Sequence, residues 1–201
     1  RRQRQMGIRD RVILINRESE HFSTVCTDND EVGLMAATKI RQKGYTEAAI
    51  FASRHSYFAT SQRVQAFISS CERLGIETDE KYILKGSSTR NGGYEIGKQY
   101  AALKEPPKMI FCDSDAIALG ALRAFHEEGI SVPGDAELLS IGMLDPEAAS
   151  YYVPSLSVVE MPNKEIGQQV LRLMRKKVLN NDISSEHVKV HAKLMLRESF
   201  S

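Results

Sequence analysis

Residues 106–142 read PPKMIFCDSDAIALGALRAFHEEGISVPGDAELLSIG, and this stretch decides the fold. A short apolar run at Met109–Cys112 ends in Asp-Ser-Asp, a helical pattern follows, and a second apolar run covers Leu138–Ile141. The order strand, helix, strand predicts a βαβ unit with a right-handed crossover. Asp113 and Asp115 then stand at the carboxyl end of a strand, where open α/β sheets bind their ligands.

The helix within this stretch has an unusual surface. Ala116–Leu122 consists of seven apolar or small residues in a row, which cover the whole circumference of a helix. A helix that is apolar all round is expected to be buried all round. One side can pack on its own sheet, and we expect a second subunit to cover the other side.

Strand and helix signals alternate along the rest of the chain. Apolar runs predict strands at 11–16, 24–27, 48–52, 82–85, 109–112, 137–141, 156–160 and 188–196. Helical periodicity, with glycine stops, predicts further helices at 30–43, 60–74, 91–103 and 163–179. This alternation predicts an α/β fold with parallel sheets flanked by helices.

Composition narrows the class of protein. The chain has 201 residues, enough for one large domain or two small lobes, and its net charge of +1 argues against a surface that coats nucleic acid. Three widely spaced cysteines without a CxxC motif favour reduced thiols and a cytoplasmic location. An apolar run of about 18 residues is lacking, so we expect no membrane span.

An ordered set of motifs resembles the LacI/GalR family of bacterial transcriptional repressors. The motifs are VILINR at 12–17, TDNDEVG at 27–33, KGY at 43–45, SQRVQAF at 61–67, IFCDSDAIALGAL at 110–122, GISVPGDAELLSIG at 129–142, VPSLSVVEMP at 153–162 and RES at 197–199. No single motif is diagnostic, but the set follows the family order over nearly the whole chain.

The resemblance implies a periplasmic-binding-protein-like α/β architecture, with two Rossmann-like lobes of parallel sheet and an effector in the cleft between them. Residues 1–46 and 161–184 would form part of the N-terminal lobe, which would be incomplete in this chain. Residues 47–160 and 185–201 would form the C-terminal lobe. Crossovers would lie near 45–47, 160–162 and 184–187. The family's DNA-binding helix-turn-helix domain has no counterpart in this sequence.

Arg63 is the strongest candidate for a ligand contact, because the resemblance implies an effector-binding arginine at this position. A guanidinium offers five donors in a fixed fork that suits sugar hydroxyls, carboxylates or phosphates. Arg63 lies one position off the apolar stripe Val64, Phe67, Ile68, Cys71 and Leu74, so we expect it to be accessible. A surface salt bridge is the alternative.

Further candidates follow three predicted strands. Tyr57 and Phe58 lie in a loop and could stack on a sugar ring or simply pack. The resemblance implies a ligand contact at Ser114, whereas Asp115 is a good helix N-cap in any case. Asp28 could form a capping box with Glu31 and also bind a ligand hydroxyl.

Asp145 marks a departure from the family pattern. The family has an effector-binding aspartate two residues after the glycine that ends a strand, but here that position is Leu144 and Asp145 follows one step later. The loop is shifted or the polar contact is lost. Ligand identity therefore cannot be transferred from known relatives.

We interpret the chain as the ligand-sensing and dimerisation core of a LacI-family regulator, with a sugar or sugar derivative as the expected effector. Leu119 and Tyr152 are the predicted dimer contacts, and operator DNA would be bound only through a separate domain. The sequence shows no P-loop, nucleophile elbow, dinucleotide fingerprint or metal cluster, which predicts a non-enzyme without metal or cofactor. A periplasmic-type sugar-binding protein is the alternative.

Overall fold

The structure is a computed structural model and describes residues 11–55, 58–142, 147–180 and 183–201. Internal contacts divide the chain into two compact units. Unit 1 takes in Arg1–Asp28 and Pro162–Ala192, and unit 2 takes in Asn29–Met161 and Lys193–Ser201. The chain therefore passes between the units at three points.

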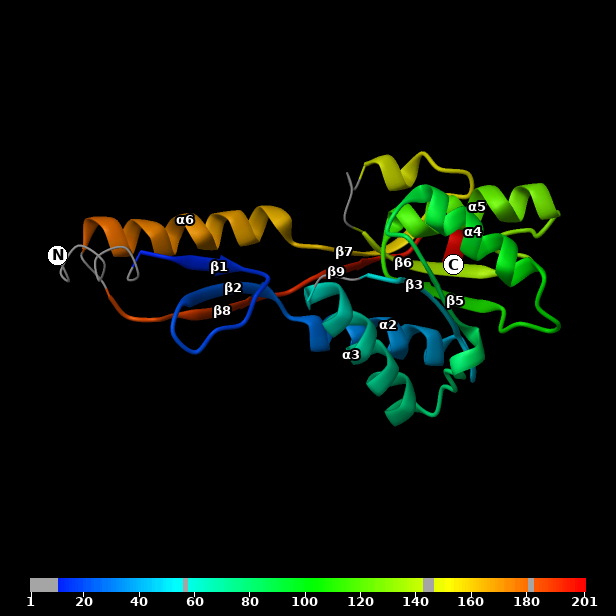
Figure 1. Cartoon of the computed structure of the whole chain (residues 1–201), viewed down its shortest axis with the longest axis horizontal. Helices are drawn as coiled ribbons and strands as arrows, with labels where there is room; N and C mark the ends of the chain where they lie inside the picture. Colours follow the sequence, from blue (N-terminus) through cyan, green and yellow to red (C-terminus); the bar gives the residue numbers. More distant parts are fainter. Residues whose placement is uncertain (1–10, 56–57, 143–146, 181–182) are drawn as a thin grey trace. The chain divides into compact units, whose positions relative to one another are not determined.

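Unit 1 has a parallel sheet in the order β1-β2-β8, and helix α6 lies along one face of it (Figure 1). The elements are β1 (Ile13–Ile15), β2 (Ser23–Thr27), β8 (His187–Val190) and α6 (Asn163–Leu179). Ile166 and Leu173, seven residues apart on one face of α6, pack with Val25 of the central strand. This small core is what the helical period over 163–179 predicts.

Unit 2 contains a six-stranded sheet in the order β4-β3-β5-β6-β7-β9. Its strands are β3 (Ala49–Ser53), β4 (Ile83–Gly86), β5 (Met109–Cys112), β6 (Glu137–Gly142), β7 (Ser157–Glu160) and β9 (Lys193–Met195). All neighbouring strands run parallel except β7 and β9, which are antiparallel. The predicted α/β class with parallel sheets is confirmed.

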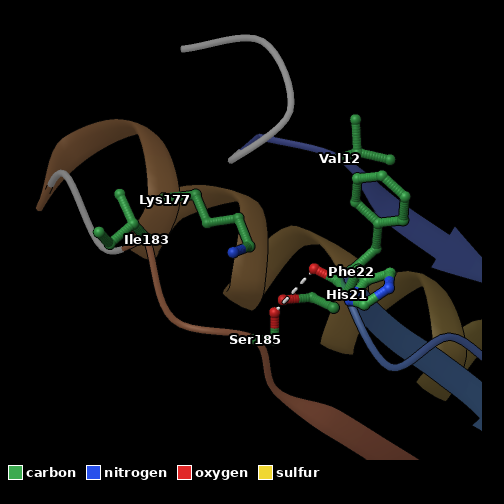
Figure 2. A pocket seen from close by; sticks show the side chains of 7 residues that line it. Val12, His21, Phe22, Lys177, Ile183 and Ser185 are labelled. Atoms are coloured by element: carbon green, nitrogen blue, oxygen red, sulfur yellow. Dashed lines mark hydrogen bonds between the residues drawn. The ribbon is translucent and has the colours of Figure 1, made fainter. Parts of the chain in front are cut away.

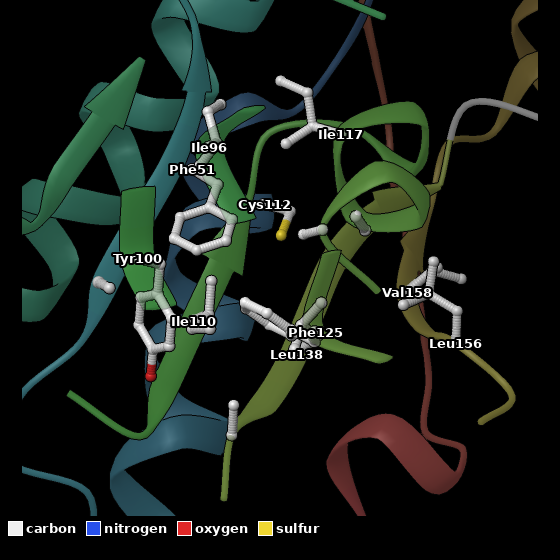
Figure 3. Packing of buried hydrophobic residues seen from close by; sticks show 14 of the residues in the cluster. Phe51, Ile96, Tyr100, Ile110, Cys112, Ile117, Phe125, Leu138, Leu156 and Val158 are labelled. Atoms are coloured by element: carbon white, nitrogen blue, oxygen red, sulfur yellow. The ribbon is translucent and has the colours of Figure 1, made fainter. Parts of the chain in front are cut away.

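Helices cover both faces of this sheet, with α2 and α3 on one side and α4 and α5 on the other (Figure 1). Their bounds are α2 (Asn29–Gln42), α3 (Phe58–Leu74), α4 (Arg90–Ala101) and α5 (Asp115–Glu128). On the first face, Phe111 of β5 stacks on Phe67 of α3 with ring centroids 4.0 Å apart. On the second face, Ile110 and Cys112 join a core that includes Phe125 of α5 (Figure 3). β5 is thus buried on both faces, which explains its unbroken apolar run.

Helix α5 packs closely against α4 on the side that its own sheet leaves free. A Cβ atom on Gly120 would lie 1.9 Å from the carbonyl oxygen of Arg90, and one on Gly93 would lie 2.1 Å from the carbonyl oxygen of Ile117. These glycines allow the two helix backbones to touch, while Leu119 stays half-buried. The apolar circumference of α5 therefore does not require a second subunit, and the dimer remains a prediction.

The predicted strand over 188–196 is two strands in different sheets. β8 pairs with β2 in unit 1, whereas β9 pairs with β7 in unit 2, so the chain must break between them. The expected division into lobes also differs from the two units. Helix α2 packs on α3 in unit 2, and β8 belongs to unit 1. The predicted division into lobes and its three crossovers stay a prediction.

Within the described ranges, no helix is both long and apolar enough to cross a membrane.

Candidate functional site

Polar residues meet where β3 and β5 end side by side in unit 2. Parallel pairing sets Phe51 opposite Cys112, so Ser53 and Asp113 leave the sheet at the same edge. The Asp113 backbone N–H donates to the Phe51 carbonyl at 2.9 Å, and Asp113 Oδ2 accepts the backbone N–H of Ser53 at 2.6 Å. This is the carboxyl edge, where α/β sheets bind ligands.

Asp113 is a buried acid, only 1% exposed. Burial raises the pKa of its carboxyl group, while hydrogen bonds from Ser53 and Ser114 and the positive charge of Arg63 oppose that rise. Its Oδ1 atom is buried and has no hydrogen-bond partner among the described residues. Buried polar atoms are nearly always satisfied, so this atom calls for an explanation.

Arg63 lies in α3 and is 3% exposed, which corrects the expectation that it is accessible. Its Nη2 donates to Thr60 Oγ1 at 3.2 Å, and its Nη1 lies 3.3 Å from the sulfur of Met161. Burial lowers the pKa of the guanidinium, and the charge of Asp113 opposes this shift. Arg63 and Asp113 are therefore a buried cation and a buried acid in the same unit, and the charge of each favours the ionised form of the other.

The buried stripe of α3 explains the difference. It consists of Ala59, Arg63, Phe67, Ser70 and Cys71, whereas the stripe predicted from sequence is rotated by about one position. The prediction gave weight to Val64 and Ile68, which are only half-buried. For this reason the sequence analysis did not select Thr60 and Met161, which contact Arg63. It selected Asp113 only as an acid after a strand, without relating it to Arg63. The spacing of small and polar residues at 59, 63 and 70 is the signal that could have located this face.

Ser114 and Asp115 begin helix α5. Ser114 is the N-cap, and its hydroxyl accepts the backbone N–H of Ile117 at 3.4 Å. Asp115 is instead the first helical residue and is buried, so the expected N-cap role belongs to Ser114. Ser114 directly follows Asp113, so the structure brings Arg63, Asp113 and Ser114 to one edge of unit 2.

The other predicted ligand contacts are more scattered. Phe58 is the first residue of α3 and is 48% exposed. Asp28 follows β2 in unit 1, where its carboxylate lies 3.4 Å from the Lys189 ammonium. Tyr57 and Asp145 lie outside the described residues. Their ligand roles remain predictions.

A second polar contact joins α2 to α3 one residue before Arg63. Asn29 Nδ2 donates to Gln62 Oε1 at 2.9 Å, at the first residue of α2. Asn29 Oδ1 is buried and, like Asp113 Oδ1, has no partner within the described part of the chain. Among the described residues of unit 2, two buried acceptor oxygens thus lack a hydrogen-bond partner.

The predicted dimer contacts, Leu119 and Tyr152, both belong to unit 2. Tyr152 is half-buried and packs against the core cluster that contains Leu156. Tyr151 and Val153 beside it are 76% and 94% exposed. An exposed valine and tyrosine in sequence are compatible with an interface but do not demonstrate one.

A hollow of about 290 Å³ opens in unit 1 (Figure 2). It is lined by Val12, His21, Phe22, Ser23, Lys177, Ile183 and Ser185. The Lys177 ammonium donates to the Ser184 carbonyl at 2.7 Å, and the Ser185 hydroxyl donates to the His21 carbonyl at 3.0 Å. Because Ser23 begins β2, this hollow lies at the amino end of the strands, opposite the edge where α/β ligands bind.

No group of three or more His, Cys, Asp or Glu side chains in the described ranges could hold a metal ion. The cysteines Cys26, Cys71 and Cys112 are free thiols.

Comparisons with known proteins identify the kind of domain. The model of the periplasmic binding protein-like domain matches residues 37–200. The chain is 27% identical over 169 residues to the HTH-type transcriptional repressor PurR of Mannheimia succiniciproducens, covering 84% of this chain and 50% of the repressor. It thus spans about half the length of the curated relatives that it matches.

Solved structures give the same result. A LacI family transcription regulator from Clostridium acetobutylicum is 31% identical, with a TM-score of 0.87, and the match covers 92% of this chain and 68% of that one. A LacI family transcriptional regulator from Enterococcus faecium with bound ribose is 21% identical, with a TM-score of 0.81, covering 94% and 70%. The second likeness concerns the fold alone.

Proposed function

The chain belongs to the LacI family of transcription regulators and carries their periplasmic binding protein-like domain, and on this premise we propose that it is the regulator's ligand-sensing and dimerisation core. The observation that carries the proposal is the polar edge of unit 2, where Arg63, Asp113 and Ser114 gather at the ends of β3 and β5. In this proposal, a small molecule binds at that edge.

We propose a sugar or sugar derivative as the effector. Two Enterococcus regulators of the LacI family with this fold hold bound ribose. Sugar hydroxyls both donate and accept hydrogen bonds, which suits an edge that combines a guanidinium, a carboxylate and a serine hydroxyl. Phe58, exposed at the start of α3, could add a stacking surface.

Regulation requires that the effector binds two conformational states with different affinity, because only differential binding shifts an equilibrium. The regulator would act in the cytoplasm as a homodimer through Leu119 and Tyr152. Operator DNA would be contacted by a DNA-binding domain that lies outside these 201 residues. A repressor binds its effector without turnover, so the proposal includes no enzymatic step.

A thermal-shift screen with neutral sugars tests the proposal. A sugar at 100 times its Kd adds about 2.7 kcal/mol to the free energy of unfolding. Arg63→Gln should abolish the shift, whereas Arg123→Gln, at an exposed arginine of α5, should retain it. The proposal fails if no sugar in the panel raises the Tm, or if both variants respond as the wild type does.

A further inference from the structure

Lys177 is a buried cation near the C-terminal end of α6 in unit 1, and it is only 5% exposed. An ammonium group has three hydrogen-bond donors, but within the described part of the chain Lys177 uses one of them, donating to the Ser184 carbonyl at 2.7 Å. That acceptor is neutral. The ion pairs formed among the described residues do not include Lys177. No described carboxylate therefore compensates its charge.

The acid closest to this contact in the sequence is already engaged. Glu186 follows Ser184 by two residues, and its carboxylate pairs with Lys176 at 2.8 Å and with Arg172 at 3.3 Å. Moving a charge out of water costs free energy, so buried ammonium groups are normally paired with an opposite charge. Lys177 lacks that counter-charge among the described residues, and a bound anion would supply it.

Lys177 lines the hollow of about 290 Å³ in unit 1, which has room for such an anion. Figure 2 shows its side chain reaching from α6 toward Ser185 and His21. At about 30 Å³ per water molecule, the hollow can hold a small organic molecule or several waters. The two ammonium donors that the Ser184 carbonyl does not use are then available to a ligand.

The walls of the hollow favour an organic anion over an inorganic one. Val12, Phe22 and Ile183 supply apolar side chains, and Ile183 is 74% exposed. A ligand with an apolar body gains free energy by removing such surface from water. The described lining contains no carboxylate that would repel a negative charge. His21 adds one ring N–H donor in either tautomer.

We infer that this hollow is a second ligand site, which takes a small organic acid with its carboxylate on Lys177 and its apolar body against Val12, Phe22 and Ile183. The site lies in unit 1 at the amino end of β2. The proposed effector edge lies instead in unit 2, at the carboxyl ends of β3 and β5. The inference therefore goes beyond the proposed function and does not depend on it. An acid bound here would stabilise unit 1 by mass action.

The test is calorimetric titration with benzoate, benzyl alcohol and acetate. Benzoate combines a carboxylate with an apolar ring, benzyl alcohol keeps the ring without the charge, and acetate keeps the charge without the ring. We expect benzoate to bind the wild type more tightly than either of the other two. Lys177→Met should weaken benzoate binding by about tenfold or more, the loss expected for a hydrogen bond to a charged group.

Two further variants separate the site from general charge removal and from misfolding. Lys164→Met removes an exposed lysine from the first turn of the same helix, and it should leave benzoate affinity within about twofold of the wild type. Lys177→Gln provides a second neutral side chain in case Lys177→Met does not fold. Equal affinities of the wild type for benzoate and benzyl alcohol would overturn the inference. So would a benzoate affinity that Lys177→Met and Lys177→Gln leave unchanged.

Amide resonances in a ¹H–¹⁵N NMR titration locate the bound acid. Benzoate should shift the resonances of 21–23 and 183–185, which line the hollow, and leave those of Ser53 and 113–117 in place. Shifts confined to Ser53 and 113–117 would overturn the inference, because they would assign the acid to the proposed effector edge of unit 2.

Discussion

Replacing Gly120 with alanine should destabilise unit 2, whereas the same change at Gly167 should stabilise unit 1. Both glycines lie in helix interiors, so both variants gain about 1 kcal/mol from helix propensity. Their surroundings differ. A Cβ on Gly120 would lie 1.9 Å from the Arg90 carbonyl oxygen and 2.5 Å from the Tyr94 nitrogen, whereas a Cβ on Gly167 would have no atom within 4 Å.

The atoms that a methyl group on Gly120 would strike belong to the backbone of α4, which cannot rotate away. The two helices must separate, and overpacking of this kind costs about 1–3 kcal/mol, occasionally more. Because rigid backbone favours the upper end, we expect a net loss of about 2 kcal/mol after the gain in propensity. At about 2–4 °C per kcal/mol for a chain of this size, the Tm should fall by about 4–8 °C. Gly167→Ala should raise it by about 2–4 °C.

Differential scanning calorimetry of the wild type and the two variants measures both changes. The reasoning is refuted if Gly120→Ala is as stable as the wild type, because α4 and α5 then do not touch through their backbones. If Gly167→Ala has a lower Tm than the wild type, alanine does not favour the helix over glycine at that position.

Three other predictions follow from the site and the surface. Arg63→Ala should lower the free energy of unfolding by about 1–3 kcal/mol, because it removes a buried side chain that bonds to the Thr60 hydroxyl. Urea denaturation that finds no loss would contradict this buried role. Burial raises the pKa of the Asp113 carboxyl group above its ordinary value of about 4. The protonated group therefore stabilises the fold at low pH, and this contribution is lost as the pH rises through the raised pKa. The stability of wild type relative to Asp113→Asn should therefore decrease from pH 4 to pH 7 in urea titrations, and a constant difference would contradict the shift. Light scattering at micromolar concentration should find a dimer that Leu119→Glu dissociates; a monomeric wild type would exclude that interface.

Most of the fold follows from local patterns in the sequence. The run Met109–Cys112 is buried on both faces, and the period over 163–179 places Ile166 and Leu173 on one core. Such features depend on residues that are close together in the sequence, so they can be predicted from the sequence of one chain. The break between β8 and β9 does not, because it depends on pairing with strands more than 30 residues away in the chain.

The site was only partly predictable for the same reason. Arg63, Ser114 and the acid Asp113 could each be selected from the sequence, because they follow strands or match a family pattern. Their mutual arrangement could not. The burial of Arg63 depends on which face of α3 packs on the sheet, and a rotation of one residue moves the guanidinium from solvent into the core. The predicted buried face of α3 was drawn from apolar residues alone. It therefore included the half-buried Val64 and Ile68 and left out the buried Arg63.

The small residues of α4 and α5 show a further limit. The sequence makes α5 apolar all round, and burial against a second subunit or against another helix satisfies that pattern equally. Gly93 and Gly120 account for one side of α5, because their missing side chains allow α4 to approach, while Leu119 on another side stays half-buried. Glycine spacing on two helices becomes informative only once their packing is known.

Hydrogen–deuterium exchange with and without a saturating sugar tests most directly where this regulator core binds its effector. We predict slower exchange at the backbone amides of Ser53 and Arg54, at the end of β3, and at 113–117, between β5 and the first turn of α5. The amides at 183–185, beside the hollow of unit 1, should exchange at an unchanged rate. Protection at 21–23 and 183–185, with none at the ends of β3 and β5, would contradict the assignment of the effector site to Arg63, Asp113 and Ser114.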